Sequence, residues 1–272
     1  MSGGGPKEPA IGVFDSGVGG LTVFRRIAEA LPREHLCYLG DTARVPYGTK
    51  SADTVIRYAR SCAAHLRARG IKMLVVACNT ASAYALEVLR DELPLPVIGV
   101  VEPGARAAIA RTKTGRVGVI GTPGTVASGA FVRAIAALSP DIRVYSQACP
   151  LFVPLVEDGW TTGPVPEAVA SRYLDRLAAR GVDTLVLGCT HYPLLRGVIA
   201  KAMGPKVCLV DSAKETAKAV VETLQDRAML QTGTRPGRRE FYASDAPESF
   251  AKVGARMLGP RTPLAQVEWV DV

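Results

Sequence analysis

Residues 70–80 read GIKMLVVACNT and residues 181–191 read GVDTLVLGCTH, so the chain contains the same kind of segment twice. Each stretch is a run of apolar residues, several of them β-branched, as is typical of a strand buried in a parallel sheet. Both runs end at a cysteine, and polar residues follow where a helix should begin. Because Cys78 and Cys189 occupy the same position in the two stretches, we predict a chain built from two similar α/β units.

Other segments repeat in the same order. Residues 116–125 (RVGVIGTPGT) resemble residues 10–19 (AIGVFDSGVG), and residues 206–211 (KVCLVD) resemble residues 96–101 (PVIGVV). Helical patterns lie between these strands. The segment 51–70 is an example, with a serine at its start and a glycine at its end. Strands that alternate with helices predict parallel sheets covered by helices on both faces.

The predicted fold is therefore two similar parallel-sheet α/β domains related by pseudo-twofold symmetry, with the active site in the cleft between them. Residues 99–211 form the second domain. The tail 212–272 holds further helices and strands but is too short to stand easily alone, so we expect it to pack back on residues 1–98 and complete a discontinuous first domain. The glycine-rich start, about 1–8, is expected to be a flexible tail.

Net charge, apolar runs and cysteine spacing argue against several classes of partner and of metal or redox site. The 272 residues carry a formal net charge of +8, a field that attracts anions. The chain has no nucleic-acid motif and no apolar run near the ~20 residues of a membrane span, so we expect neither nucleic acid nor membrane as a direct partner. Without a signal-peptide pattern, we expect a cytoplasmic protein. The six cysteines contain no CxxC pair, which argues against zinc-ribbon and thioredoxin-like sites.

Polar residues follow many of the predicted strands, at the carboxyl ends where ligands bind in open parallel sheets. They are Asp15, Ser16, Asp41, Thr42, Cys78, Asn79, Thr80, Thr122, Cys189, Thr190 and His191. Two facing domains would bring both cysteines into one cleft from opposite sides.

Cysteines at the starts of helices are candidates for reactive thiols. The helix N-terminus favours anions, so we expect the pKa of Cys78 and Cys189 to fall below about 8.5 and the thiolate to be populated. Cys37, Cys62 and Cys208 lie inside apolar patterns and are expected to be small buried side chains, and Cys149 is also expected to be structural.

Two opposed thiols predict one particular reaction. One thiolate removes a proton from a carbon, and the other thiol returns a proton to the opposite face, which inverts a stereocentre without any cofactor. A zinc site at Cys78, Cys189 and His191 would consume both thiolates, so we expect no metal. The residues alone indicate a cofactor-free racemase or epimerase of an anionic substrate.

Neighbouring polar residues then have candidate roles. Asp15 can pair with a substrate ammonium and orient Cys78, and Ser16 can donate to a carboxylate. His191 and Glu157 can tune Cys189. Alternatively, Asp15 and Ser16 only cap a helix, and Glu157 is a solvated loop residue.

Four segments carry a family resemblance: FDSGVGGLTV (14–23), GDTARVPYG (40–48), ACNTASA (77–83) and GCTHYPLL (188–195). They resemble the glutamate racemases of the aspartate/glutamate racemase family, and the resemblance runs from about residue 11 to 212. It implies two α/β domains around a shared cleft, cofactor-independent interconversion of L- and D-glutamate, a cytoplasmic supply of D-glutamate for peptidoglycan, and a homodimer.

The resemblance also implies residue roles. Cys78 acts on D-glutamate and Cys189 on L-glutamate, assisted by Asp15, Glu157 and His191. The implied substrate-binding residues are Asp15, Ser16, Tyr47, Gly48, Asn79, Thr80, Thr122, Thr125, Thr190 and His191. Among these, Thr122 and Thr125 match the region that receives the side-chain carboxylate.

Two alternatives stay open. Aspartate racemases or related amino-acid racemases use a similar cysteine pair, but an acidic residue usually follows their second GCT segment, where this chain has His191. The other alternative is a regulatory binding protein, since some members of the family are reported to bind DNA gyrase and a basic chain can bind an acidic partner.

Overall fold

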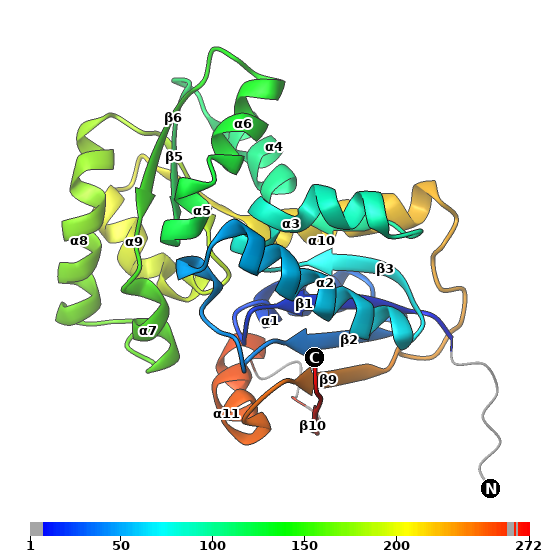
Figure 1. Ribbon diagram of the computed structural model, residues 1–272. Coiled ribbons are helices and arrows are strands. Elements are labelled where there is room, and N and C mark those ends of the chain that lie inside the picture. Colours follow the sequence, from blue (N-terminus) through cyan, green and yellow to red (C-terminus); the bar gives the residue numbers. More distant parts are fainter. Residues whose placement is uncertain (1–7, 260–263, 265) are drawn as a thin grey trace, which may run out of the picture.

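The computed structural model describes residues 8–259, 264 and 266–272, which form two parallel sheets with helices packed around them (Figure 1). Residues 1–7 of the predicted flexible tail lie outside the described part of the chain. None of the described helices combines the length and the apolar character that crossing a membrane requires.

The first sheet has the strand order β10-β9-β2-β1-β3-β4, and every pair is parallel. Its strands are β1 (Ala10–Asp15), β2 (Leu36–Gly40), β3 (Ile71–Val76), β4 (Val97–Gly99), β9 (Arg239–Ala243) and β10 (Val267–Trp269). Side chains alternate between the two faces: Ile11 and Val13 enter one hydrophobic core, and Phe14 enters the other. The central strands are buried on both faces, which explains their continuous apolar sequences.

The second sheet repeats the arrangement of the first. It contains β5 (Arg116–Gly121), β6 (Arg143–Ala148), β7 (Thr184–Gly188) and β8 (Cys208–Asp211) in the order β6-β5-β7-β8. This is the order β2-β1-β3-β4 of the first sheet, and all pairs are again parallel. The prediction of two similar α/β units is confirmed. The strands before Cys78 and Cys189, β3 and β7, hold equivalent places in the two sheets.

Helices cover both faces of each sheet (Figure 1). They are α1 (Leu21–Ala30), α2 (Ala52–Ala68), α3 (Asn79–Glu92), α4 (Val101–Arg111), α5 (Pro123–Ala127), α6 (Ala130–Leu138), α7 (Phe152–Glu157), α8 (Pro164–Ala179), α9 (Arg196–Met203), α10 (Ser212–Asp226) and α11 (Pro247–Leu258), with short 3₁₀ turns η1 (Tyr47–Thr49) and η2 (Tyr192–Leu195). In the first sheet, α1, α10 and α11 pack on one face, and α2 and α3 pack on the other.

The chain passes from the first sheet to the second after β4 and returns after β8, and β9 and β10 then extend the first sheet at its edge. The domain boundaries given above stay a prediction. Cys208 departs from expectation: its side chain is exposed, because it begins β8, the edge strand of the second sheet. Cys37 and Cys62 are buried, as predicted, and Cys149 is buried as well.

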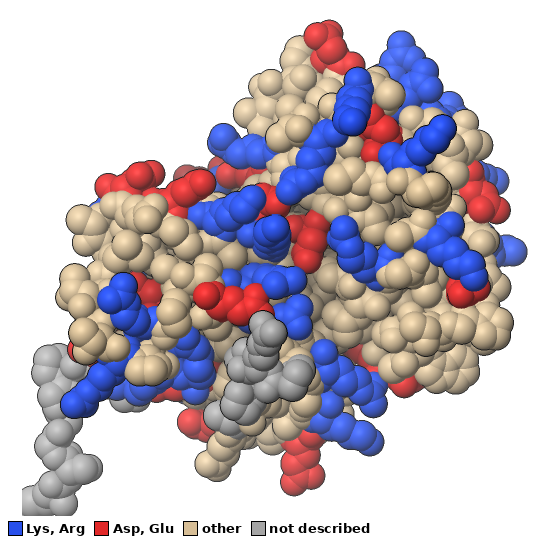
Figure 2. Space-filling view, turned by 180° about the vertical axis from the view of Figure 1, so that it is seen from behind, with Lys and Arg blue, Asp and Glu red and all other residues tan. Residues whose placement is uncertain are grey.

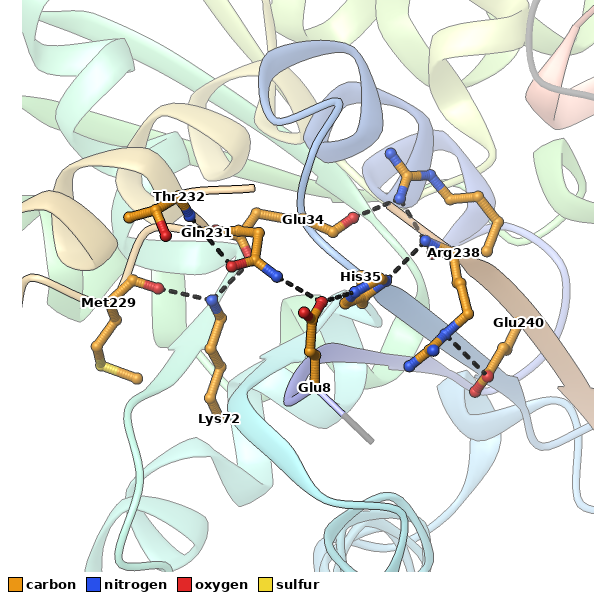
Figure 3. Close-up of polar contacts among 10 residues, drawn as sticks. Glu8, Glu34, His35, Lys72, Met229, Gln231, Thr232, Arg238 and Glu240 are labelled. Carbon is orange, nitrogen blue, oxygen red and sulfur yellow. Dashed lines mark hydrogen bonds and ion pairs between the residues drawn. The ribbon is translucent and has the colours of Figure 1, made fainter. Parts of the chain in front are cut away.

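The returning segment is anchored at the amino ends of the strands of the first sheet (Figure 3). Glu34 is only 2% exposed and its Oε2 lies 2.7 Å from Lys72 Nζ. Glu34 Oε1 accepts the Gln231 N–H at 2.6 Å, and Lys72 donates to the Met229 carbonyl at 2.6 Å. A buried ion pair therefore joins the turn before β2 to β3, and both of its members bind the segment between α10 and β9 through hydrogen bonds.

Surface charge is mixed on the face turned by 180° from the view of Figure 1. Lys and Arg side chains are interspersed there with Asp and Glu (Figure 2). Several charged side chains of the protein are paired across neighbouring helices, as Arg90 is with Glu102 and Arg111 with Glu215, each at 2.7 Å. The positive net charge therefore does not form one continuous basic stripe on this face.

Candidate active site

A cavity of about 310 Å³ lies between the two sheets, where residues that follow strands of both sheets meet. The predicted site residues that line it are Asp15, Ser16, Tyr47, Gly48, Cys78, Asn79, Thr80, Thr122, Glu157, Cys189, Thr190 and His191. The structure thus brings both cysteines to one cavity. A larger groove of about 930 Å³, whose lining includes residues of α4 and α10, contains neither cysteine.

Cys78 follows β3 and caps the start of α3. Its Sγ accepts the Ala81 N–H at 3.5 Å, and its thiol donates to Ser16 Oγ at 3.7 Å. Burial and the Asp15 carboxylate nevertheless raise the pKa of Cys78 to about 12. The predicted fall in this pKa is wrong, because burial and a nearby negative charge outweigh the hydrogen bonds at the helix start.

Asp15 ends β1 and is 1% exposed. Its Oδ2 accepts the Gly17 N–H at 3.2 Å, but its Oδ1 has no hydrogen-bond partner among the described residues. Burial raises the pKa of Asp15, although the positive charge of His191 opposes that change. Asn79 is 3% exposed, and both polar atoms of its amide also lack a partner within the described part of the chain. Buried polar atoms normally have partners, so these two side chains indicate a place for a polar ligand.

Cys189 follows β7 and lies beside a histidine–carboxylate pair. His191 Nδ1 is 3.9 Å from Cys189 Sγ, and His191 Nε2 is 2.9 Å from Glu157 Oε1 at the end of α7. Burial alone would lower the pKa of His191, but its contacts with Cys189 and Glu157 raise the pKa to about 10. An imidazolium therefore lies 3.9 Å from the Cys189 sulfur at neutral pH.

Three threonine hydroxyls join the two halves of the site. Thr80, at the start of α3, lies 2.9 Å from Thr122 Oγ1 and 3.1 Å from Thr125 Oγ1. Thr122 and Thr125, which belong to the second half, are 3.0 Å apart. Of the implied catalytic and substrate-binding residues, Thr125 alone does not line the cavity, and it is only 2% exposed and bonded to the hydroxyls of Thr80 and Thr122.

The segment 45–49 forms another wall of the cavity, and buried Asp41 anchors it. The Tyr47 hydroxyl donates to Asp41, and burial raises the pKa of Tyr47 well above its usual range. Arg44 Nε and the Ser244 hydroxyl also donate to Asp41. Gly48 approaches the second half so closely that a Cβ there would lie 2.6 Å from Thr122 Cβ.

Sequence reasoning assigned no role to Asp41 and missed the apolar part of the lining, which consists of Val45, Pro46, Pro123, Pro150, Val153 and Pro154. A signal was present, since residues 149–157 directly follow β6 at the same edge of the sheet. No group of three or more metal-ligating side chains comes together among residues 8–259, 264 and 266–272.

Comparison with known proteins gives consistent matches. Residues 11–220 match the model of the Asp/Glu/Hydantoin racemase family. A glutamate racemase from Geobacter metallireducens is 56% identical over 92% of this chain and 93% of its own length. One from Corynebacterium diphtheriae is 51% identical over 92% and 94%.

Solved structures of glutamate racemases match over nearly the whole chain. A glutamate racemase from Bacillus anthracis superposes with a TM-score of 0.94 at 41% identity and covers 98% of both chains. The glutamate racemase from Francisella tularensis, solved in complex with D-glutamate, gives 0.90 at 37% identity and covers 97% of both. An aspartate racemase from Picrophilus torridus gives 0.60 at 15% identity, which supports a shared fold only.

Proposed function

The chain belongs to the Asp/Glu/Hydantoin racemase family, and from that membership we propose that it interconverts L-glutamate and D-glutamate without a cofactor, using Cys78 and Cys189. The observation that carries the proposal is that both thiols line one cavity of about 310 Å³. The similar proteins from G. metallireducens and C. diphtheriae are named glutamate racemases, which supports glutamate as the substrate.

The lining offers partners for each charged group of glutamate. Asp15 Oδ1, which has no hydrogen-bond partner among the described residues, is suited to the ammonium, beside Cys78. The Asn79 amide and the hydroxyls of Thr80 and Thr122 are suited to carboxylates. These groups would hold the α-carbon between the two thiols, so that each sulfur faces one side of it.

The proposed reaction transfers one proton at each face. Starting from L-glutamate, the Cys189 thiolate removes the α-proton, and the electron pair of the broken C–H bond remains as a carbanion stabilised by the carboxylate. The Cys78 thiol then gives its proton to the opposite face of that carbon. Cys189 is now a thiol and Cys78 a thiolate, and proton exchange with solvent restores the starting state.

The neighbours of the thiols fit these roles. The imidazolium of His191 favours the thiolate at Cys189. The raised pKa of Cys78 keeps that residue protonated and ready to donate. In the opposite direction Cys78 must be a thiolate, and a substrate ammonium next to Asp15 would offset the carboxylate that disfavours it.

The wider role is also part of the proposal. We expect a cytoplasmic enzyme that acts as a homodimer and supplies D-glutamate for peptidoglycan, as the family resemblance implies. The boundaries 1–98 plus 212–272 and 99–211 are our assignment of its domains.

The test is a chiral assay on the purified protein. Each enantiomer of glutamate and of aspartate is incubated without added cofactor and with a chelator, in ordinary and in heavy water. We expect glutamate to racemise and its product to carry deuterium at the α-carbon, with far slower turnover of aspartate. Faster turnover of aspartate would reassign the substrate. No turnover of either would refute the proposal.

Single variants test the two-thiol mechanism. Cys78→Ser and Cys189→Ser should each slow racemisation by at least about 10²-fold, because serine is a far weaker acid than cysteine. Cys149→Ser is the matched control, since Cys149 is buried and does not line the cavity. Full activity in both Cys78→Ser and Cys189→Ser would exclude the mechanism.

A further inference from the structure

In the first half of the molecule, residues 17–22, which comprise the turn after β1 and the first two residues of α1, pack directly against the segment that carries Cys189. At Gly19, a Cβ atom would lie 2.3 Å from Thr190 Oγ1 and 2.5 Å from His191 Nδ1. The backbone of Gly19 is not left-handed, so other residues could adopt its conformation. What the position excludes is a side chain, because Thr190 and His191 occupy that space.

Thr22 links the same two segments by a hydrogen bond. Its side chain is 2% exposed, and its hydroxyl lies 3.1 Å from the Thr190 carbonyl and 2.9 Å from the Gly19 carbonyl. The bond to Thr190 crosses from α1 to the residue immediately after Cys189. The turn therefore touches the Cys189 segment at two points, by close packing at Gly19 and by a hydrogen bond at Thr22.

His191 has little freedom to move away from this contact. Its ring is 6% exposed, with Glu157 Oε1 2.9 Å from Nε2 and Cys189 Sγ 3.9 Å from Nδ1. A methyl group at Gly19 would press on Thr190 Oγ1 and His191 Nδ1, and we expect the ring to shift away from Cys189 or to lose its contact with Glu157. Either change alters the charge beside the thiol.

We propose that Gly19 and Thr22 are positioning residues that hold Thr190 and His191 beside Cys189 from the opposite half of the molecule. This inference rests on the proposed racemisation of glutamate. It predicts that the turn affects only one of the two proton transfers, the transfer at Cys189. Changes in the turn should therefore slow that step and leave the proton transfer at Cys78 unchanged.

The one-sided effect appears in isotope exchange. L- and D-glutamate have equal free energy, so a variant must lose the same factor in kcat/KM in both directions. When D-glutamate reacts in heavy water, however, Cys78 removes the proton first and the slowed step at Cys189 comes second. The carbanion then returns to D-glutamate, with a deuteron whenever the Cys78 thiol has exchanged. From L-glutamate the slowed step comes first, so exchange cannot outpace inversion.

The experiment compares Thr22→Val with Thr22→Ser, and Gly19→Ala with Gly197→Ala. Valine has the shape of threonine without the hydroxyl, whereas serine keeps it. Gly197 in α9 has open space where a Cβ would lie, which makes it the matched control. Circular dichroism and thermal melting establish that each variant folds, and if Gly19→Ala does not fold, the Thr22 pair decides.

We expect Thr22→Val and Gly19→Ala to lower kcat/KM by about 10- to 10²-fold, since small misplacements of catalytic groups have effects of this size. α-Deuteration of D-glutamate should then exceed its inversion, while deuteration and inversion of L-glutamate stay equal. Thr22→Ser and Gly197→Ala should behave as wild type. Unchanged rates, or exchange that stays in step with inversion for both enantiomers, would overturn the inference. A wild-type protein that does not racemise glutamate would instead overturn the proposed function.

Discussion

Replacing Glu157 by glutamine should shift the pH dependence of the proposed reaction. The change removes the carboxylate 2.9 Å from His191 Nε2 but leaves an oxygen in its place. Burial tends to lower the pKa of His191, and the contacts with Cys189 and Glu157 raise it to about 10. Without the carboxylate, the effect of burial is opposed by fewer contacts, and the pKa of His191 must fall. His191 then loses its charge at a lower pH, and the thiolate at Cys189 loses its cationic neighbour.

The size of the shift follows from the geometry. A neighbouring opposite charge within hydrogen-bonding distance moves a pKa by about 1 to 3 units, and each unit corresponds to about 1.4 kcal/mol. Because the Glu157 side chain is 39% exposed, solvent weakens the pair and the lower half of that range applies. The alkaline loss of activity governed by His191 should therefore begin about 1 to 2 pH units lower in Glu157→Gln.

The assay measures kcat for L-glutamate against pH, together with an NMR titration of the His191 ring. The substrate ammonium titrates equally in both proteins and cancels in the comparison. Glu167→Gln is the control, because Glu167 lies 2.6 Å from Lys201 on the surface of the same half of the molecule, away from the cavity. The same pKa also fixes the sign of the effect on stability. A raised pKa of His191 stabilises the fold fully below about pH 6.5, and this stabilisation is lost as the pH rises through 10. An unmoved alkaline limb would refute the role given to Glu157.

Three further outcomes are expected. Lys72→Met leaves the buried carboxylate of Glu34 without its ion-pair partner and should lower the free energy of unfolding, measured in urea, by about 3–5 kcal/mol. Adding Glu34→Gln to this variant should restore most of the loss, and a double variant no more stable than Lys72→Met alone would contradict this. Gly48→Ala forces a Cβ to within 2.6 Å of Thr122 Cβ and should raise KM for glutamate by about tenfold with little change in melting temperature, whereas an unchanged KM would show that the contact is unimportant. A thiol reagent should label Cys208 faster than Cys37, Cys62 and Cys149, which are buried and do not line the cavity, and mass spectrometry that finds one of these three labelled as fast as Cys208 would argue against the burial described above.

Much of the fold was accessible from the sequence because its strands are buried on both faces. The apolar runs before Cys78 and Cys189 identify β3 and β7 without any knowledge of packing, and the repeat of these runs predicts the repeated strand order. The carboxyl ends of parallel strands share one edge, so the polar residues at those ends could be assigned to one site. Local sequence was sufficient for these two steps.

Other properties, namely a pKa, a position relative to the cavity and the exposure of a side chain, depend on contacts between distant segments and could not be predicted from the sequence. The pKa of Cys78 is set by burial and by Asp15 from another strand, so the rule for helix starts gave the wrong direction. Thr125 is separated from the cavity by Thr80, which belongs to the other half of the chain. Cys208 follows the apolar pattern of a buried strand but begins an edge strand, and edge position is a property of the assembled sheet.

The two halves repeat their strand order but not the charges beside their cysteines. Asp15 disfavours a negative charge on Cys78, whereas the imidazolium of His191 favours one on Cys189. In the proposed reaction one thiol must donate a proton while the other accepts one. A site with identical neighbours would leave both sulfurs in the same protonation state, and a proton would have to move before any turnover. The difference between Asp15 and His191 therefore supplies what the repeated fold alone cannot, an anionic neighbour for one thiol and a cationic neighbour for the other.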